Sequence, residues 1–236
     1  MHSRLVLADA DTARDVLTFF GRAMLVSDDG VRLQGARGVL ALSAAALAPQ
    51  GLFDSTPTVL AMRMVHADPE LECDIVVDEL NPDQDERMLA LPETGRSPAW
   101  AGVAPPRGGW ERTGTLEASK VAQRAQWGIS AVARGSAPGA GEEAVRALRA
   151  AIWGEPDEDL AGLPRGVAFA AHAFGFITST RDARSVHRSG EENVSITTSG
   201  RWTRLGFGRG HVLTRGPMAS GLTAVRTTGP SSGTEL

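Results

Sequence analysis

The stretch of this sequence best suited to chemistry is 201–216, where arginine, glycine and histidine alternate with apolar residues. Glycine lets backbone N–H groups approach an anion closely, and arginine can hold a phosphate or a carboxylate through two hydrogen bonds. A hairpin with Gly206, Gly208 and Gly210 in it therefore suits anion binding, although a tight bulged turn that needs positive φ at glycine is the favoured explanation. The candidate anion- or partner-binding residues are Arg201, Arg204, Arg209, His211 and Arg215.

Signatures of catalysis and of metal binding are weak. The five histidines form neither H-x-H nor H-E-x-x-H, and a site from His66, Asp68, Cys73 and Asp74 would require the fold to bring them together. Acidic neighbours raise the pKa of Cys73, which makes it a poor nucleophile. We therefore predict no catalytic residue, no metal and no cofactor, and the prediction leans against an enzyme.

The nearest approach to a nucleotide fingerprint is 139–144, a relaxed G-x-G-x-x-A pattern. Pro138 precedes it where a strand is needed, and Glu142 and Glu143 would repel a pyrophosphate. This segment is better explained as the start of a helix, since acidic residues stabilise a helix N-terminus.

Charge is distributed unevenly along the chain. Residues 68–93 contain ten acids and a single arginine, whereas no Asp or Glu occurs between Glu192 and Glu235. A solvated edge is the favoured explanation of the acidic segment. The sharper hypothesis is contact between the basic hairpin and an acidic protein, most simply the acidic segment of a second copy in a homodimer. Nucleic-acid binding through the same hairpin is an alternative, and the net charge of −4 counts against it.

Composition is ordinary for a soluble globular chain of 236 residues, with 42% hydrophobic and 22% charged residues. One cysteine excludes an intrachain disulfide and fits a reducing compartment. The N-terminus lacks the apolar run of a signal peptide, and the longest apolar stretch, 167–177, is too short to span a membrane. The sequence predicts a cytoplasmic protein without membrane contact.

The elements that would position these residues fall into two groups. In the first, we expect a strand at 4–8, a helix from Asp9 to Gly21, a strand at 23–27, a hairpin of 31–34 with 39–43, a helical turn at 44–48, and strands at 58–65 and 73–77. In the second, we expect a helix from Thr115 to Ala133 with Val121, Ala125, Gly128 and Val132 buried, and a helix from 141 to 154. The second group also contains a buried strand at 167–177, for which a buried helix is the alternative. It ends with a meander of three strands at 193–198, 201–207 and 210–215.

These groups predict an α+β protein of two lobes, each combining helix with a mainly antiparallel sheet. The expected boundaries are 1–95 for the first lobe, 96–112 for a Pro/Gly-rich connector, 113–226 for the second lobe and 227–236 for a disordered tail. Arg32-Leu33 before Arg37-Gly38 repeats in Arg204-Leu205 before Arg209-Gly210, a faint sign of duplication.

Two tryptophans in the connector are too apolar to remain in water, so we expect this segment to be held against a lobe. A ligand-binding protein or an enzyme with a pocket between the lobes is the second functional hypothesis, and its lining would include Trp100, Trp110 and Phe174. The favoured prediction is a non-catalytic interaction protein that uses the basic hairpin.

Overall fold

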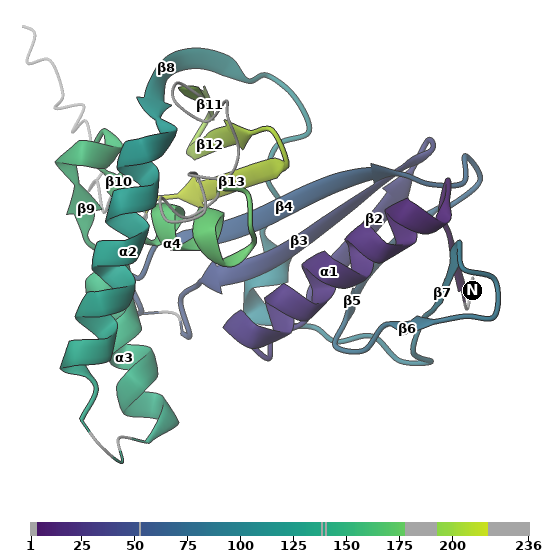
Figure 1. The fold of residues 1–236 in the computed structure, drawn as a ribbon, viewed down its shortest axis with the longest axis horizontal. Coiled ribbons are helices and arrows are strands. Elements are labelled where there is room, and N and C mark those ends of the chain that lie inside the picture. The colour runs from purple at the N-terminus through teal and green to yellow at the C-terminus, as the bar shows by residue number, and fades with distance from the viewer. Residues whose placement is uncertain (1–3, 52, 138, 140, 178–192, 217–236) are drawn as a thin grey trace, which may run out of the picture.

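The computed structural model describes residues 4–216 apart from 52, 138, 140 and 178–192. It is an α+β fold built on one eight-stranded antiparallel sheet of order β5-β2-β3-β4-β13-β12-β11-β8 (Figure 1). The predicted fold class is confirmed. The elements of the N-terminal half are β1 (Arg4–Val6), α1 (Ala10–Val26), β2 (Val31–Ala36), β3 (Val39–Leu47), β4 (Thr58–His66), β5 (Cys73–Val77), β6 (Asn81–Pro82) and β7 (Met88–Ala90).

The C-terminal half begins after a short 3-10 turn, Ala99–Gly102. Its elements are β8 (Glu111–Glu117), α2 (Ala118–Gly135), α3 (Glu142–Gly154), β9 (Pro156–Asp157), the 3-10 turn Glu158–Leu160, β10 (Leu163–Pro164), α4 (Gly166–Ala173), β11 (Asn193–Ser199), β12 (Trp202–Phe207) and β13 (Gly210–Arg215). Strands β1, β7 and β6 form a small separate sheet, and β9 pairs with β10.

The two halves share the large sheet because β13 pairs with β4, from His211 opposite Met62 to Arg215 opposite Thr58. We call this pairing the seam. On either side of the seam the order is mirrored, β4-β3-β2-β5 on one side and β13-β12-β11-β8 on the other. The repeated Arg-Leu and Arg-Gly pairs do not occupy matching places in this order, since one set lies in β2–β3 and the other in β12–β13.

Helix α1 begins where the sequence predicts, because Asp9 accepts a hydrogen bond from the Thr12 amide at 2.7 Å and so caps the first turn. The predicted stop at Gly21 and the predicted strand at 23–27 are wrong, since the helix continues to Val26. Ala23 is buried on the same face as Val16, so packing against the sheet outweighs the low helix propensity of one exposed glycine. The helical turn expected at 44–48 is also wrong, because β3 runs on to Leu47.

Two expectations for the C-terminal half need correction. Residues 111–117 form strand β8, and α2 starts at Ala118 rather than Thr115. The segment 167–177 is not a strand, because α4 occupies most of it. A segment that is apolar on every side has no period to distinguish strand from helix. Arg22 donates a hydrogen bond of 2.7 Å to the Phe174 carbonyl, which satisfies a free acceptor near the end of α4.

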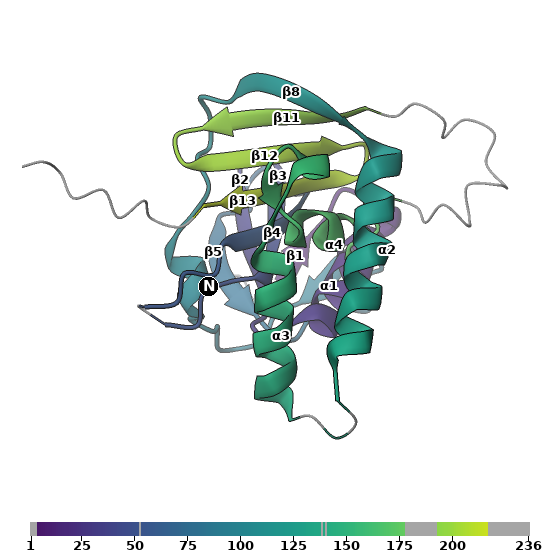
Figure 2. The same ribbon diagram turned by 90° about the vertical axis from the view of Figure 1, so that its left-hand side faces the viewer.

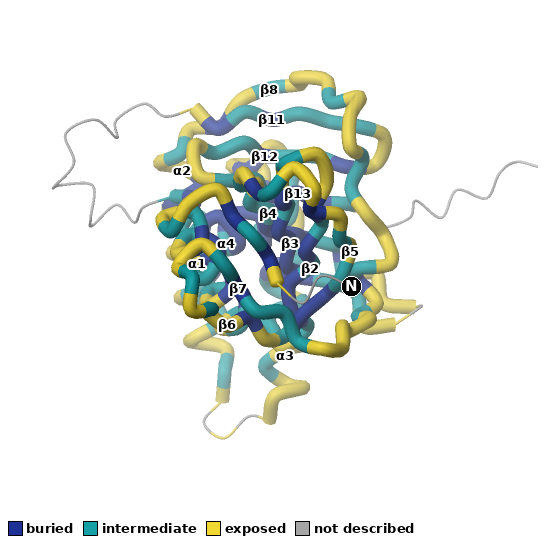
Figure 3. The backbone as a smooth tube through the Cα atoms, turned by 90° about the vertical axis from the view of Figure 1, so that its right-hand side faces the viewer, coloured by how far each residue is buried: buried dark blue, intermediate teal, exposed yellow. Residues whose placement is uncertain are grey.

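Side chains pack on both faces of the large sheet, in two separate clusters. The helical face carries the main core, in which Val16 and Phe19 of α1 and Val121 of α2 meet inward-facing residues such as Leu205 and Val212. Figure 2 shows α2, α3 and α4 gathered on this side. Buried residues run along much of β3 and through parts of β4 and β13 (Figure 3). The other, helix-free face carries a smaller cluster.

The helix-free cluster explains how the Pro/Gly-rich connector is held. Trp100 is 6% exposed and packs with Trp202, Leu60 and Leu213, while Trp110 lies at the edge of the same cluster. The expectation that the connector's tryptophans hold it against the protein is confirmed. The tail predicted at 227–236 lies outside the described residues. None of the described helices has the length and apolar character needed to cross a membrane.

Candidate functional site

A groove of about 270 Å³ lies on the helix-free face, where the connector passes over the seam. We call it the sheet groove. Its floor comes from Met62 and Met64 of β4 and from Leu213 of β13, and Pro105, Pro106 and Trp110 of the connector form one wall. Arg204, His211, Val39 and Arg107 also line it.

Strand register brings these side chains to one face. His211 pairs with Met62, and Arg204 pairs with Leu213. Residues two apart in a strand point to the same side, so Met62 and Met64 both face the groove, whereas Ala61 and Val212 face the helices. Met64 is 49% exposed and Val39 is 39% exposed. The groove therefore presents apolar surface to solvent.

Arg204 is the fixed cation of the groove. Its guanidinium lies over the ring of Trp110, 4.5 Å from the ring centroid, and its Nε donates a hydrogen bond of 3.2 Å to Thr197 Oγ1. It forms no ion pair within the described part of the chain. Burial lowers the pKa of Arg204, although an arginine remains protonated under all ordinary conditions. A held guanidinium without a counter-ion favours a negatively charged ligand group.

His211 lies beside Arg204, and its surroundings favour the neutral form of the imidazole ring. Burial lowers the pKa of His211, and the positive charge of Arg204 lowers it further. Its Nδ1 is buried and has no hydrogen-bond partner among the residues described. Neutral imidazole has one donor and one acceptor nitrogen, so His211 adds hydrogen-bonding capacity to the wall without adding charge.

The carboxylate at the rim of the groove is already engaged. Asp74 accepts hydrogen bonds from Arg32 Nε at 2.7 Å and Arg32 Nη2 at 2.9 Å, and from Gln34 at 3.1 Å. These contacts hold the pKa of Asp74 below its usual value, the hydrogen bond from Arg32 being the largest cause. Arg107, exposed at the rim, has no ion pair with any described residue. The unbalanced charge of the groove is therefore positive.

Of the basic residues predicted as a binding set, the structure brings only Arg204 and His211 together. Arg201 lies in the β11–β12 turn and donates a hydrogen bond of 3.0 Å to the Gly216 carbonyl. Arg209 lies in the β12–β13 turn, where its carbonyl accepts a hydrogen bond from Arg63. Arg215 lies at the far end of β13, opposite Trp202.

Gly206 and Gly210 of the β12–β13 hairpin are explained by close packing, and the positive φ expected of them is not observed. Gly206 and Gly210 are absent from the described residues with positive φ. A Cβ on Gly210 would lie 2.5 Å from Phe176 and 2.8 Å from the Met62 carbonyl, and one on Gly206 would lie 2.5 Å from Ser195 Oγ. No side chain fits at Gly210 without a shift.

The three residues expected to line one pocket do not meet. Trp110 lines the sheet groove, Trp100 is buried in the helix-free cluster, and Phe174 lies in the main core on the helical face. Sequence reasoning missed Met62, Met64 and the two prolines of the groove wall. The available signal was methionine at alternate positions of a predicted strand, which marks one exposed or half-exposed face.

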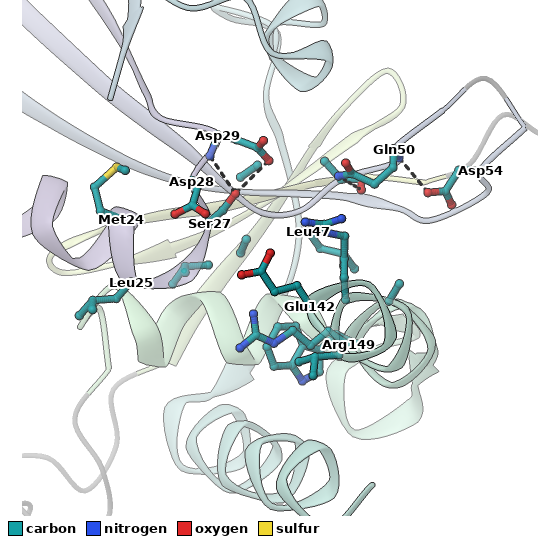
Figure 4. A pocket seen from close by; sticks show the side chains of 18 residues that line it. Met24, Leu25, Ser27, Asp28, Asp29, Leu47, Gln50, Asp54, Glu142 and Arg149 are labelled. Carbon is teal, nitrogen blue, oxygen red and sulfur yellow. Dashed lines mark hydrogen bonds between the residues drawn. The ribbon is translucent and has the colours of Figure 1, made fainter. Parts of the chain in front are cut away.

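A second concavity, of about 420 Å³, lies between the end of α1, the end of β3 and helix α3. Figure 4 shows Glu142 and Arg149 of α3 across from Asp28 and Asp29 of the turn after α1. Asp28 and Glu142 are exposed. No group of three potential metal ligands occurs in the described ranges. The concavity holds exposed charges of both signs with no assembled set of chemical groups, so the sheet groove is the better candidate.

Four of the ten acids in segment 68–93 form ion pairs with arginines of the described residues. Asp74 pairs with Arg32, Asp78 with Arg96, Asp83 with Arg4, and Asp85 with Arg87. Exposed pairs of this kind stabilise little, yet they cancel part of the negative charge of the segment. The strong opposition of charge expected between this segment and the basic hairpin is therefore reduced in the folded chain.

Comparison with protein-family models gives two matches, one for each half of the chain. Residues 1–102 match the family model described as domain of unknown function DUF8010, and residues 105–219 match domain of unknown function DUF8185. The two matches meet inside the connector, at 103–104. No curated protein matches the chain.

Among solved structures, the chain is similar to DNA polymerase sliding clamps. The Caulobacter crescentus clamp is 12% identical, with 98% of this chain and 70% of the clamp covered at a TM-score of 0.44. The clamp of Bartonella birtlesii bound to griselimycin is 14% identical, with 98% and 67% covered at 0.45, and that of Bacillus subtilis is 10% identical, with 90% and 63% covered at 0.41.

Proposed function

We propose that this chain is a non-catalytic interaction protein whose sheet groove binds a segment of another protein. The observation that supports it is one surface that combines exposed Met64 and Val39 with a held, unpaired Arg204. Exposed apolar groups beside arginine and tryptophan are typical of protein-binding surfaces. Methionine adapts its shape to different side chains, which suits such a role.

Catalysis is a weaker explanation of the same groove. Within the described residues, the groove has one histidine, His211, and its carboxylate Asp74 is bound to Arg32. Burial raises the pKa of Cys73, so that thiol is a poor nucleophile. A nucleophile poised beside a base is therefore missing from this surface.

Nucleic-acid binding is also a weaker explanation. A phosphate backbone is bound by several cations spread along a path, and affinity comes mainly from them. Here Arg201, Arg209 and Arg215 lie outside the groove, and its floor is apolar. The net charge of −4 opposes non-specific attraction to a polyanion.

The test is site-specific photo-cross-linking with a benzophenone amino acid at position 64. The control places the same group at Ser130, which is exposed on α2 on the helical face. We expect position 64 to give an adduct of one defined mass with one partner protein, which mass spectrometry identifies. The same adduct should form when this chain and that partner are mixed as purified proteins. An adduct with a second copy of this chain would give the homodimer form of the proposal. Equal adducts at both positions, or none at 64, would refute it.

A further inference from the structure

The chemistry of the sheet groove also indicates what its partner carries. We infer that the bound segment presents an aliphatic side chain next to a carboxylate, the first filling the cavity and the second pairing with Arg204. This inference rests on the proposed function and adds the chemical class of the partner.

The apolar part follows from the size and lining of the cavity. A volume of about 270 Å³ over Met62, Met64 and Leu213 has room for a large apolar side chain together with a neighbouring group. The prolines of the wall add rigid apolar surface, and they donate no backbone hydrogen bond. Burial of an aliphatic side chain here would remove apolar surface from water, which favours binding.

The carboxylate follows from the charges that face the cavity. Arg204 and Arg107 form no ion pair with a described residue, and Asp74, whose pKa Arg107 also lowers, is bound by Arg32 and Gln34. The stacking of Arg204 on Trp110 and its hydrogen bond to Thr197 fix the guanidinium before a ligand arrives. A pre-positioned cation loses little side-chain freedom on binding, so the ion pair is more favourable than one between mobile chains.

A protein segment fits these observations better than a phosphate-bearing ligand. The cation and the apolar floor are adjacent, so one ligand must offer an anion and an aliphatic group within one or two residues. A peptide does this with a single pair of neighbouring residues, whereas a nucleic acid offers flat bases and regularly spaced phosphates.

Methyl-labelled methionine gives a direct test, because the chain has six methionines and two of them lie on the groove floor. The full chain, labelled with [methyl-13C]methionine, is titrated with acetyl-Gly-Ser-Leu-Asp-Gly-Ser-amide, with the same peptide carrying Asn for Asp, and with an oligo-dT 12-mer. We expect the methyl signals of Met62 and Met64 to shift while that of Met24, in the other concavity, stays in place. The Asp peptide should bind about tenfold more tightly than the Asn peptide.

Variants separate carboxylate recognition from the presence of a binding groove. Arg204→Gln should abolish the preference for the Asp peptide, and Arg201→Gln, outside the groove, should keep it. Equal binding of both peptides, no methyl shift with either, or a stronger shift with the oligonucleotide would overturn the inference. A cross-link from position 64 that persists despite such a result would leave the proposed function standing, so the two failures are distinguishable.

Discussion

The substitution Asp157→Asn should destabilise the protein, because Asp157 forms ion pairs with two arginines, Arg124 of α2 and Arg165 directly before α4. Its side chain is 3% exposed, and its Oδ2 accepts hydrogen bonds from Arg124 Nε at 2.8 Å and Arg165 Nε at 3.1 Å. Both guanidinium groups also lie over the ring of Trp127, at 5.1 and 4.6 Å. Asparagine keeps the shape of the side chain and removes its charge.

The size of the effect follows from how buried the arginines are. Loss of one partner from a fully buried ion pair costs about 3–5 kcal/mol. Arg124 and Arg165 keep 24% and 19% of their side chains exposed, and Asp159 and Glu155 also contact them, so water and these carboxylates recover part of the loss. We expect a decrease of about 2 kcal/mol in the free energy of unfolding, which lowers Tm by about 4–8 °C for a chain of this length.

The pH dependence gives a second measure of the same contact. Burial raises the pKa of Asp157, but the hydrogen bonds from Arg124 and Arg165 outweigh it, and the net pKa is lowered. A carboxyl with a lowered folded-state pKa stabilises the protein above its unfolded value, about 3.9, and this contribution is lost as pH falls through the folded value. The difference between wild type and Asp157→Asn should therefore shrink below about pH 4.

Urea unfolding followed by circular dichroism measures these free energies. Asp159→Asn is the matched control, because that carboxylate contacts the same Arg124 at 3.6 Å but is 61% exposed, so its loss should cost under about 1 kcal/mol. If Asp157→Asn costs no more than Asp159→Asn at pH 7, the assignment of a buried, stabilising ion pair is wrong.

Three further predictions use the same unfolding assay. Gly21→Ala should stabilise the protein by about 0.5–1 kcal/mol, because Gly21 is an exposed interior position of α1 with no atom within 4 Å of an added Cβ; a loss of stability would mean that the helix does not continue through it. Gly210→Ala should destabilise by about 1–3 kcal/mol, because its Cβ would overlap Phe176, and an unchanged midpoint would contradict that packing. The pKa of His211 is lowered, so its contribution to stability is complete above about pH 6.5 and is lost as pH falls below it. His211→Gln should flatten the fall in unfolding free energy between pH 7.5 and 5.5, and an unchanged slope would show that His211 is not the group responsible.

The sequence predicts secondary structure well where apolar residues recur with a clear period. Strands β2 to β5 and the β11–β13 meander were expected near their observed places, because alternation and turn residues mark them. The 167–177 segment was misassigned because a run of alanine and phenylalanine lacks a period. The end of α1 was misplaced at Gly21, because the helix continues to Val26 through contact of Ala23 with the core. That contact depends on tertiary structure and cannot be read from the local sequence.

The candidate site was only partly visible for a physical reason. Arg204 and His211 are close in the chain, so a local pattern revealed them. Met62 and Met64 reach the groove only through the pairing of β4 with β13, and Trp110 reaches it only because the connector crosses that pairing. Such proximity depends on contacts between distant parts of the chain, which composition and spacing do not record. The division into lobes at 96–112 stays a prediction.

The seam between β4 and β13 has a consequence for how this chain can be divided. Cutting between 102 and 105 would separate the two family matches cleanly in sequence. It would, however, leave unpaired those backbone N–H and C=O groups of Thr58–Met62 that face β13, while β3 stays paired with the other edge of β4. Unpaired N–H and C=O groups at a strand edge can form hydrogen bonds with a strand of another molecule. We therefore expect each half, when produced alone, to self-associate through this exposed edge. Co-production of the two halves should give a single homogeneous species.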